Sequence, residues 1–289
     1  MEILKKILPQ NCFGNDTIIA RNLFTRENYR GIIIFLEKYD NYLIKIFIDR
    51  IDDLEYVCYN EWRLIHFICC CSTPEMIKYI IDKGVDSECE TNERWRPIHY
   101  ICRYSTPEMI KYIIDKDVEL ECETNNKWKP IHYICRHSTP EMIKYIIDKG
   151  VDLKCETNDK WRPIHYICRH STPEIIKYII DKNVELECEN NNKYRPIHFV
   201  CRYSTLEIIK YLIDYGVDLN IKNNNGKFPI DYIKDEQMQG YVKAHMMYQA
   251  NDDEELMMQH LQNKNELYQA GFQMAIKKLF GKCNKNARK

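Results

Sequence analysis

The string WRPIHYICRYSTPEMIKYIIDK, residues 95–116, decides how the chain folds, because it returns almost unchanged from Trp128 and again from Trp161. A proline marks the same phase of each copy. These prolines are spaced by thirty-three residues: Pro97, Pro130, Pro163, Pro196 and Pro229. A fixed period of this size is typical of stacked supersecondary units, each of which covers its apolar face only against its neighbours. The sequence therefore predicts an array of repeats.

Each repeat is expected to contain two helices and a loop. Pro97 fits the first position of a helix, where its missing N–H is not needed, and apolar residues then recur at i, i+3 and i+4 on one face. Ser105 or Thr106 can cap a second helix, which opens with proline and glutamate and continues with an apolar stripe. The stretch VDLKCETNDK at 151–160 is extended and rich in turn residues, so it predicts a hairpin loop.

At these positions the unit resembles the ankyrin repeat, whose signature reads roughly G-x-T-P-L-H-x-A-A, then L-E-I-V-K-L-L-L, then G-A-D. The segments RPIHYIC, PEMIKYIID and KGVD occupy those places in phase. The resemblance covers about residues 60–235 and implies an all-α ankyrin-repeat solenoid, with a helix–turn–helix and a hairpin loop in each 33-residue unit. The composition, rich in Ile, Lys, Asn and Tyr, is also similar to that of ankyrin proteins from large DNA viruses of amoebae.

The sequence departs from the ankyrin signature at two positions before the first helix. The family's glycine is kept only as Gly226. Its other counterparts are Glu61, Arg94, Lys127, Lys160 and Lys193. The family's threonine before proline is replaced by Arg96, Lys129, Arg162, Arg195 and Phe228. Without that threonine, the family's usual hydrogen bond between threonine and histidine is not expected.

The array is expected to end in atypical units, because the ends of a solenoid need one solvated face. Weaker helix patterns precede the repeats, as GIIIFLEK and NYLIKIFIDR, and follow them, as GKFPIDYIKD. We expect an N-terminal extension at 1–28, a degenerate capping repeat at 29–57, ankyrin repeats at 60–89, 93–122, 126–155, 159–188 and 192–221, a C-terminal capping repeat at 225–249, and a helical tail at 250–289.

The tail ends in FQMAIKKLFGKCNKNARK, residues 272–289, which is basic and contains no acid. Phe272, Ile276 and Leu279 fall on one apolar stripe of a helix. Two interpretations follow: an amphipathic helix for a partner, a membrane surface or nucleic acid, or a packed terminal helix with a solvated basic end. We favour the packed helix, since charge at chain termini is common.

The composition is that of an ordinary folded chain. Of 289 residues, 45% are hydrophobic and 29% charged, and the net charge of −1 gives no overall attraction to nucleic acid or anionic membrane. No apolar run approaches the length of a transmembrane helix, and the start, MEILKKILPQNCF, lacks the apolar core of a signal peptide. We therefore expect no membrane span and an intracellular, cytoplasmic location.

Repeated His/Cys pairs and fourteen cysteines raise the question of metal sites and disulfides. The pair His99 and Cys102 recurs, but zinc needs four ligands at one point, and like residues of stacked helices lie about 8–10 Å apart. That spacing also exceeds the ~7 Å Cα limit for a disulfide. The run CCC at 69–71 lacks the C-x-x-C spacing of a redox or zinc motif. We favour reduced cysteines and, as the ankyrin resemblance implies, histidines that bond loop backbone between units.

No catalytic motif appears in the chain. It contains no Gly-rich phosphate loop, no G-x-S-x-G and no H-E-x-x-H. An enzyme needs one irregular site, whereas this chain offers the same site several times. We predict a non-enzymatic protein with no cofactor and no metal.

Equivalent exposed positions of successive repeats line up as a row of side chains along the array. In ankyrin folds the hairpin tips and the first helices line a concave face. The candidate partner-binding residues are a hairpin row of Trp95, Trp128, Trp161 and Tyr194, a row after the first helix of Arg103, Arg136, Arg169 and Arg202, and beside it Tyr104, His137, His170 and Tyr203. Trp, Tyr and Arg dominate interface energetics because each buries much area for little lost freedom. The alternatives are that Trp packs on the neighbouring loop, and that Arg pairs with acids such as Glu121 and Glu123.

The second helix carries a charged row of its own. A lysine and an aspartate four residues apart recur in each unit, as in Lys111 and Asp115. Alternating charge of this kind predicts a solvated convex face.

Our first functional hypothesis is a protein-interaction module that binds a partner protein, from a host cell if the viral resemblance holds, on its concave face. The alternative is single-stranded nucleic-acid binding through the Arg and aromatic rows and the basic tail, but the near-zero net charge and acidic loops weigh against it. A third hypothesis is an adaptor whose terminal segments recruit ubiquitin machinery, although no F-box is recognisable.

Overall fold

A computed structural model describes residues 29–243, apart from positions 52, 117, 171, 204, 237 and 241. Within these residues the chain forms helices, turns and loops, and no strand. The predicted extension 1–28 and tail 250–289 lie outside the described residues. The helices are α3 (Tyr29–Lys38), α4 (Asn41–Asp49), η2 (Tyr59–Glu61), α5 (Leu64–Cys71), α6 (Pro74–Asp82), α7 (Pro97–Tyr104), α8 (Pro107–Asp115), α9 (Pro130–His137), α10 (Pro140–Asp148), α11 (Pro163–His170), α12 (Pro173–Asp181), α13 (Pro196–Tyr203), α14 (Leu206–Tyr215) and η3 (Pro229–Tyr232).

Proline begins the first helix of a repeat. In α7 the extended residue Arg96 precedes Pro97, whose ring fixes φ at a helical value and whose missing N–H would have had no partner inside the helix. The helix ends after eight residues because Ser105 is extended, and the Ser105 N–H donates to the Ile101 carbonyl at 2.9 Å. The same segment therefore forms a short, sharply bounded helix in successive repeats.

Threonine caps the second helix. Thr106 is extended, and its Oγ1 accepts the Met109 N–H at 3.4 Å. Pro107 and Glu108 follow in the first turn, where the missing donor and the negative charge are both favourable. Of the two candidates, Thr106 rather than Ser105 is the N-cap.

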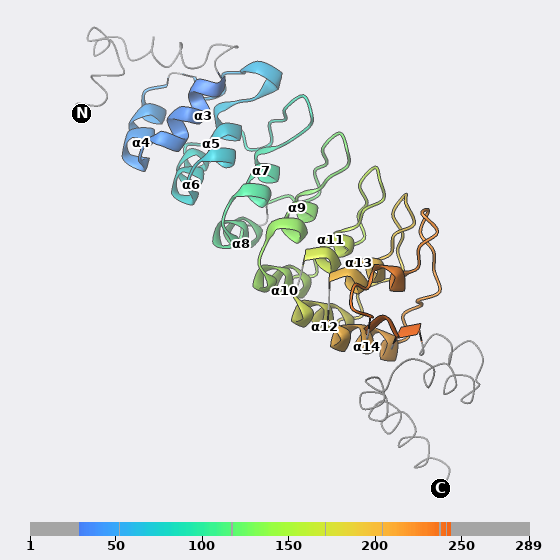
Figure 1. The fold of residues 1–289 in the computed structure, drawn as a ribbon. Coiled ribbons are helices and arrows are strands. Elements are labelled where there is room, and N and C mark those ends of the chain that lie inside the picture. The colour runs from blue at the N-terminus through green and yellow to red at the C-terminus, as the bar shows by residue number, and fades with distance from the viewer. Residues whose placement is uncertain are drawn as a thin grey trace, which may run out of the picture. The chain divides into compact units, whose positions relative to one another are not determined.

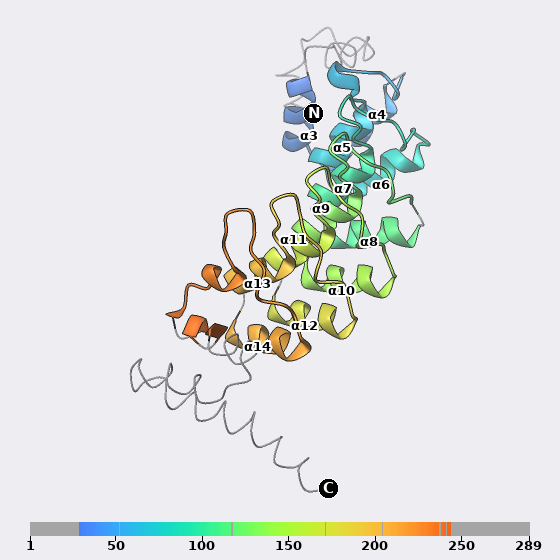
Figure 2. The ribbon, with the colours of Figure 1, turned by 90° about the vertical axis from the view of Figure 1, so that its right-hand side faces the viewer.

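The chain divides into two compact units, one ending at Tyr166 and the other beginning at Ile167. In the first unit, α5, α7 and α9 lie side by side, and α4 packs against α6 (Figure 1). In the second unit, α14 packs against α12, and η3 packs against α13 (Figure 2). Isoleucines such as Ile101, Ile110 and Ile113 are buried between the helices, as the apolar stripes predict.

The loops between helix pairs are hairpins without a strand ladder, and in the first unit they project to the same side of the helices (Figure 1). The Thr91 N–H donates to the Trp95 carbonyl at 3.0 Å, and the Trp95 N–H donates to Thr91 Oγ1 at 3.1 Å. The Asn125 N–H reaches back to the Glu93 carbonyl of the preceding loop at 3.0 Å. Each hairpin is thus closed by its own backbone and linked to its neighbour.

Candidate functional site

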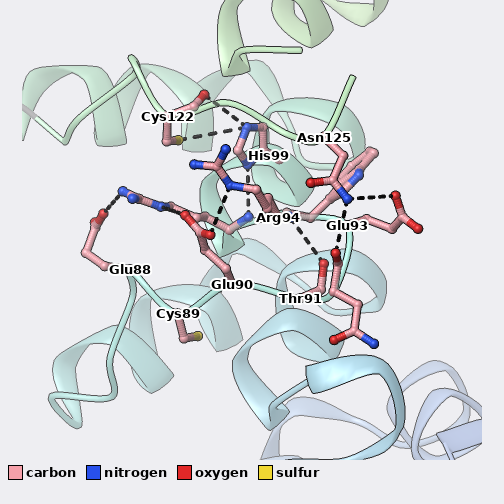
Figure 3. A network of polar contacts seen from close by, with 12 residues as sticks. Glu88, Cys89, Glu90, Thr91, Glu93, Arg94, His99, Cys122 and Asn125 are labelled. Carbon is pink, nitrogen blue, oxygen red and sulfur yellow. Dashed lines mark hydrogen bonds and ion pairs between the residues drawn. The ribbon is translucent and has the colours of Figure 1, made fainter. Parts of the chain in front are cut away.

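A buried histidine on the first helix connects that helix to the next loop. His99 Nδ1 accepts the Arg96 N–H at 3.0 Å, so the proton is on Nε2, which lies 3.3 Å from the Cys122 carbonyl oxygen (Figure 3). His66 makes the equivalent contacts, at 2.9 Å and 3.2 Å. Burial lowers the pKa of His99 to about 4, because the charged imidazolium would lose its hydration. These imidazoles are therefore neutral structural groups, in agreement with the role that the ankyrin resemblance implies.

The cation that replaces the family's threonine pairs with loop acids. Arg96 forms ion pairs with Glu90 at 3.0 Å, with Glu119 at 3.4 Å and with Glu88. Lys129 pairs with Glu121 at 2.7 Å. In the second unit, Arg195 pairs with Glu187 at 2.5 Å and with Glu189 at 2.8 Å. The loop acids are therefore engaged by the residue before proline rather than by the arginines in the last turn of the first helix.

The hairpin tryptophans of the first unit pack between tyrosines of successive first helices. The Trp95 ring lies 4.9 Å from Tyr100 and 5.0 Å from Tyr133, and Trp128 lies 4.8 Å from Tyr133 and 5.2 Å from Tyr166. We call this series the aromatic ladder: Trp62, Tyr100, Trp95, Tyr133, Trp128, Tyr166 and Trp161. Its tyrosines are buried and its tryptophans half-buried, so the Trp row is largely a packing feature that stabilises repeat stacking.

In the second unit a tyrosine takes the place of tryptophan. Tyr194 lies 5.5 Å from Phe199, with the two rings stacked, and 5.8 Å from Tyr232. The hydroxyl oxygens of Tyr194 and Tyr232 are 2.7 Å apart. Tyr194 therefore shares a hydrogen bond with Tyr232 at the position where the preceding repeats have tryptophan.

The arginines predicted to follow the first helices instead lie in the last turn of those helices, where they are exposed. In the first unit, Arg103 and Arg136 lie over rings of the aromatic ladder. The Arg103 guanidinium carbon lies 5.5 Å from the Trp95 ring and 5.0 Å from Tyr104, and that of Arg136 lies 5.7 Å from Trp128. Cation–π contacts of this kind cover one face of the guanidinium and leave its N–H edges open. Together with their exposed neighbours these residues form the cationic ridge of the first unit: Arg103, Tyr104, Arg136 and His137. The second unit by itself exposes the equivalent residues Arg169, His170, Arg202 and Tyr203.

Sequence reasoning missed the bonds made by tyrosines of the second helices. The Tyr79 hydroxyl donates to Asp49 at 2.5 Å, and the Tyr211 hydroxyl donates to Asp181 at 2.5 Å, thirty residues earlier in the chain. Asp115 likewise accepts from Tyr145. The predicted row of solvated aspartates is therefore partly bonded to the next repeat, a pairing that the i, i+30 recurrence of Asp and Tyr could have indicated.

These contacts define a class of molecule: a repeat protein whose helix pairs are joined by buried histidines, stacked aromatic rings and linked hairpins. The chain matches family models of ankyrin repeats (3 copies) over residues 33–123, 64–157 and 106–190, and of ankyrin repeats (many copies) over residues 179–233. The chain belongs to the ankyrin-repeat family, and its fold is the all-α ankyrin solenoid. Ankyrin repeats are protein–protein interaction modules and typically non-enzymatic scaffolds.

A solved structure shows the same fold. The chain is similar to the crystal structure of the human ASB11 ankyrin repeat domain, with a TM-score of 0.54 and 19% sequence identity over 68% of this chain and 90% of that chain. No curated protein matches the sequence. Among the described residues, no helix is both long and apolar enough to cross a membrane, and no three metal-ligating side chains cluster.

Proposed function

We propose that the protein is a non-enzymatic scaffold that binds a partner protein through the cationic ridge, on the concave face that the ankyrin resemblance implies. The observation that carries this proposal is the support of the exposed Arg103 and Arg136 guanidinium groups on tryptophan rings. An arginine fixed in this way loses little freedom on binding, and its open N–H edges fit a carboxylate in bidentate geometry.

The expected partner presents acidic side chains to the ridge. Within the described residues neither Arg103 nor Arg136 forms an ion pair with an acid, whereas the loop cations Arg96 and Lys129 do. Exposed tyrosine completes the surface: Tyr104 is 51% exposed. A partner with acids next to an apolar residue would match this pattern of charge and ring.

The geometry favours a protein over single-stranded nucleic acid. Base stacking needs an open aromatic face, but the tryptophans of the aromatic ladder have tyrosine rings against them. The adaptor hypothesis depends on segments 1–28 and 250–289, which lie outside the described residues. The intracellular, cytoplasmic location and the origin in a large DNA virus of amoebae stay predictions.

The test is affinity capture from an amoebal lysate with the full chain as bait. We expect Arg103→Glu combined with Arg136→Glu to abolish capture of the specific partners without changing the midpoint of unfolding. A matched control, Lys111→Glu with Lys144→Glu, makes the same charge change on the second helices and should leave capture intact. Equal capture by all three proteins would overturn the assignment. Loss of the captured proteins after nuclease treatment would favour nucleic acid instead.

A further inference from the structure

The aromatic ladder sets the distance at which the cationic ridge repeats. The Trp95 and Trp128 rings of successive repeats lie 5.0 Å and 4.8 Å from the same Tyr133 ring. The two tryptophan rings are therefore at most about 10 Å apart, in agreement with the ~8–10 Å between packed helices. Arg103 lies over Trp95 at 5.5 Å and Arg136 lies over Trp128 at 5.7 Å, so the two guanidinium groups repeat with about the same spacing.

Neighbouring rings also hold the first guanidinium in place. The Arg103 guanidinium carbon lies 5.0 Å from Tyr104 and 5.9 Å from Tyr133 of the next repeat. Arg103 and Arg136 are exposed, and within the described residues neither forms an ion pair. The first unit therefore presents two fixed positions for an anion, one repeat apart, with the half-exposed Tyr104 ring beside the first of them.

The spacing selects one backbone conformation for a bound chain. A polyproline II helix has three residues per turn and rises about 3.1 Å per residue, so every third side chain returns to one face after about 9.3 Å. A β-strand returns side chains to one face after about 6.6 Å or 13 Å, and neither distance fits. An α-helix needs seven residues and about 10.5 Å, more than the ladder allows. Proline-rich chains in the polyproline II conformation also dock on aromatic side chains, and an exposed tyrosine lies within the ridge.

We propose that the cationic ridge binds a proline-rich segment in the polyproline II conformation with an acidic residue at every third position, an inference that rests on the proposed function. Two carboxylates three residues apart pair with Arg103 and Arg136, and the intervening prolines pack against Tyr104. Because such a segment is already extended before it binds, it loses little conformational entropy on the ridge.

Fluorescence anisotropy with two labelled peptides of identical composition tests the spacing. The peptide EPPEPPEPP carries an acid at every third residue, whereas PPPEEEPPP has its acids in one block. The protein is the full chain with Arg169→Gln and Arg202→Gln, so that the equivalent arginines of the second unit do not contribute. We expect the periodic peptide to bind at least about tenfold more tightly than the block peptide, because only its acids reach both guanidinium groups.

Two further substitutions in the same protein assign the contacts. Either Arg103→Gln or Arg136→Gln should remove the difference between the peptides, because one arginine is satisfied equally by both. Lys111→Gln makes the same charge change on α8 and should leave the difference intact. Circular dichroism checks that each variant keeps its helices.

The outcomes separate this inference from the proposed function. Equal affinity for the two peptides would overturn it, as would tighter binding of a helical peptide with glutamates seven residues apart. If neither peptide binds but capture from lysate still depends on Arg103 and Arg136, the polyproline II ligand is wrong and the proposed function stands. If neither binding nor capture depends on these arginines, both are wrong.

Discussion

Single residues of the hairpins show how this chain departs from its family without losing the turn. The family's glycine position has φ of 57° at Arg94, 57° at Lys127 and 56° at Lys160, in the left-handed region that costs a side chain about 1–2 kcal/mol. At Gly226 the same turn has φ of 70° and no Cβ to strain it. Hydrogen bonds within the hairpin hold the backbone in this conformation despite its cost, so lysine and arginine are tolerated there. Their charged side chains are exposed at the hairpin tips.

Replacing such a residue by glycine should stabilise the protein. We expect Lys127→Gly to raise the free energy of unfolding by up to about 1 kcal/mol, because relief of left-handed strain exceeds the added entropy of the unfolded chain. Urea denaturation measures the change. The control Lys111→Gly, in the middle of α8, should lower stability by about 1 kcal/mol. If both variants lose stability equally, the strain argument is wrong.

The residue before proline shows a second departure. The histidine bond uses the backbone N–H of Arg96, not its side chain, so replacing the family's threonine leaves that bond in place. The side chain is then available for the acids of the loop. The expectation that histidine would lose its bond to this position is therefore wrong, because the backbone N–H supplies the donor and the side chain forms ion pairs with the loop.

Helices and hairpins are joined through aromatic rings and imidazoles rather than through a strand ladder. Trp95 contacts Tyr100 of its own repeat and Tyr133 of the next one, so it joins the two repeats across their shared interface. His99 joins the start of α7 to the following loop. The sequence left open whether the tryptophans bind a partner or pack, and the ring contacts favour packing.

Removing one tryptophan should therefore cost stability before it costs binding. We expect Trp95→Ala to lower the free energy of unfolding by roughly 2–4 kcal/mol, because two ring contacts are lost and a cavity forms. The control Tyr104→Ala removes a half-exposed ring and should change stability by less than about 1 kcal/mol. A Trp95→Ala protein as stable as the parent would mean that the aromatic ladder contributes little to stacking.

The buried histidines predict a loss of stability in mild acid. The pKa of His66, His99 and His132 is about 4 in the folded protein, below the ordinary value of about 6.5 in the unfolded chain. Between these values the unfolded chain binds protons and the folded protein does not. Stability is therefore complete above about pH 6.5 and falls as the pH drops towards 4, by up to about 1.4 kcal/mol per pH unit for each histidine.

Urea unfolding at a series of pH values checks this slope. His99→Gln should be less stable at neutral pH, because a glutamine cannot make the same two bonds, but its stability should depend less steeply on pH between 6.5 and 4. A slope equal to that of the parent protein would show that His99 is protonated in the folded state or already protected in the unfolded one.

For the molecule as a whole, repetition means that each described repeat is stabilised mainly by its neighbours. The same stabilising interactions occur in both units. Neighbouring hairpins are linked by backbone hydrogen bonds, a histidine at the third helical position accepts a backbone N–H, and a cation before the helix pairs with loop acids. The free energy of unfolding should therefore depend on the number of interfaces between repeats. Partner binding should depend on the residues that these interactions leave exposed.

Deleting one repeat tests this view. Removal of residues 126–158 joins Asn125 to Asp159 and restores the sequence TNDKW, so the hairpin register is kept. We expect a folded protein with lower thermal stability and a smaller denaturant m-value, because less surface is exposed on unfolding. Circular dichroism and urea titration measure both, and a shortened chain that fails to fold would contradict the nearest-neighbour view.

The fold could be predicted from three features of the sequence: the thirty-three-residue period, the proline and threonine at the helix starts, and the apolar stripes. These features act within each repeat and recur from one repeat to the next. The role of each surface row could not be predicted in the same way. Whether Trp128 is exposed depends on Tyr166, and whether Asp115 is solvated depends on Tyr145. Each partner lies in the following repeat, thirty or more residues away in the chain. Such contacts exist only once the repeats stack, so the stacking decided which positions stabilise the array and which remain exposed to a partner.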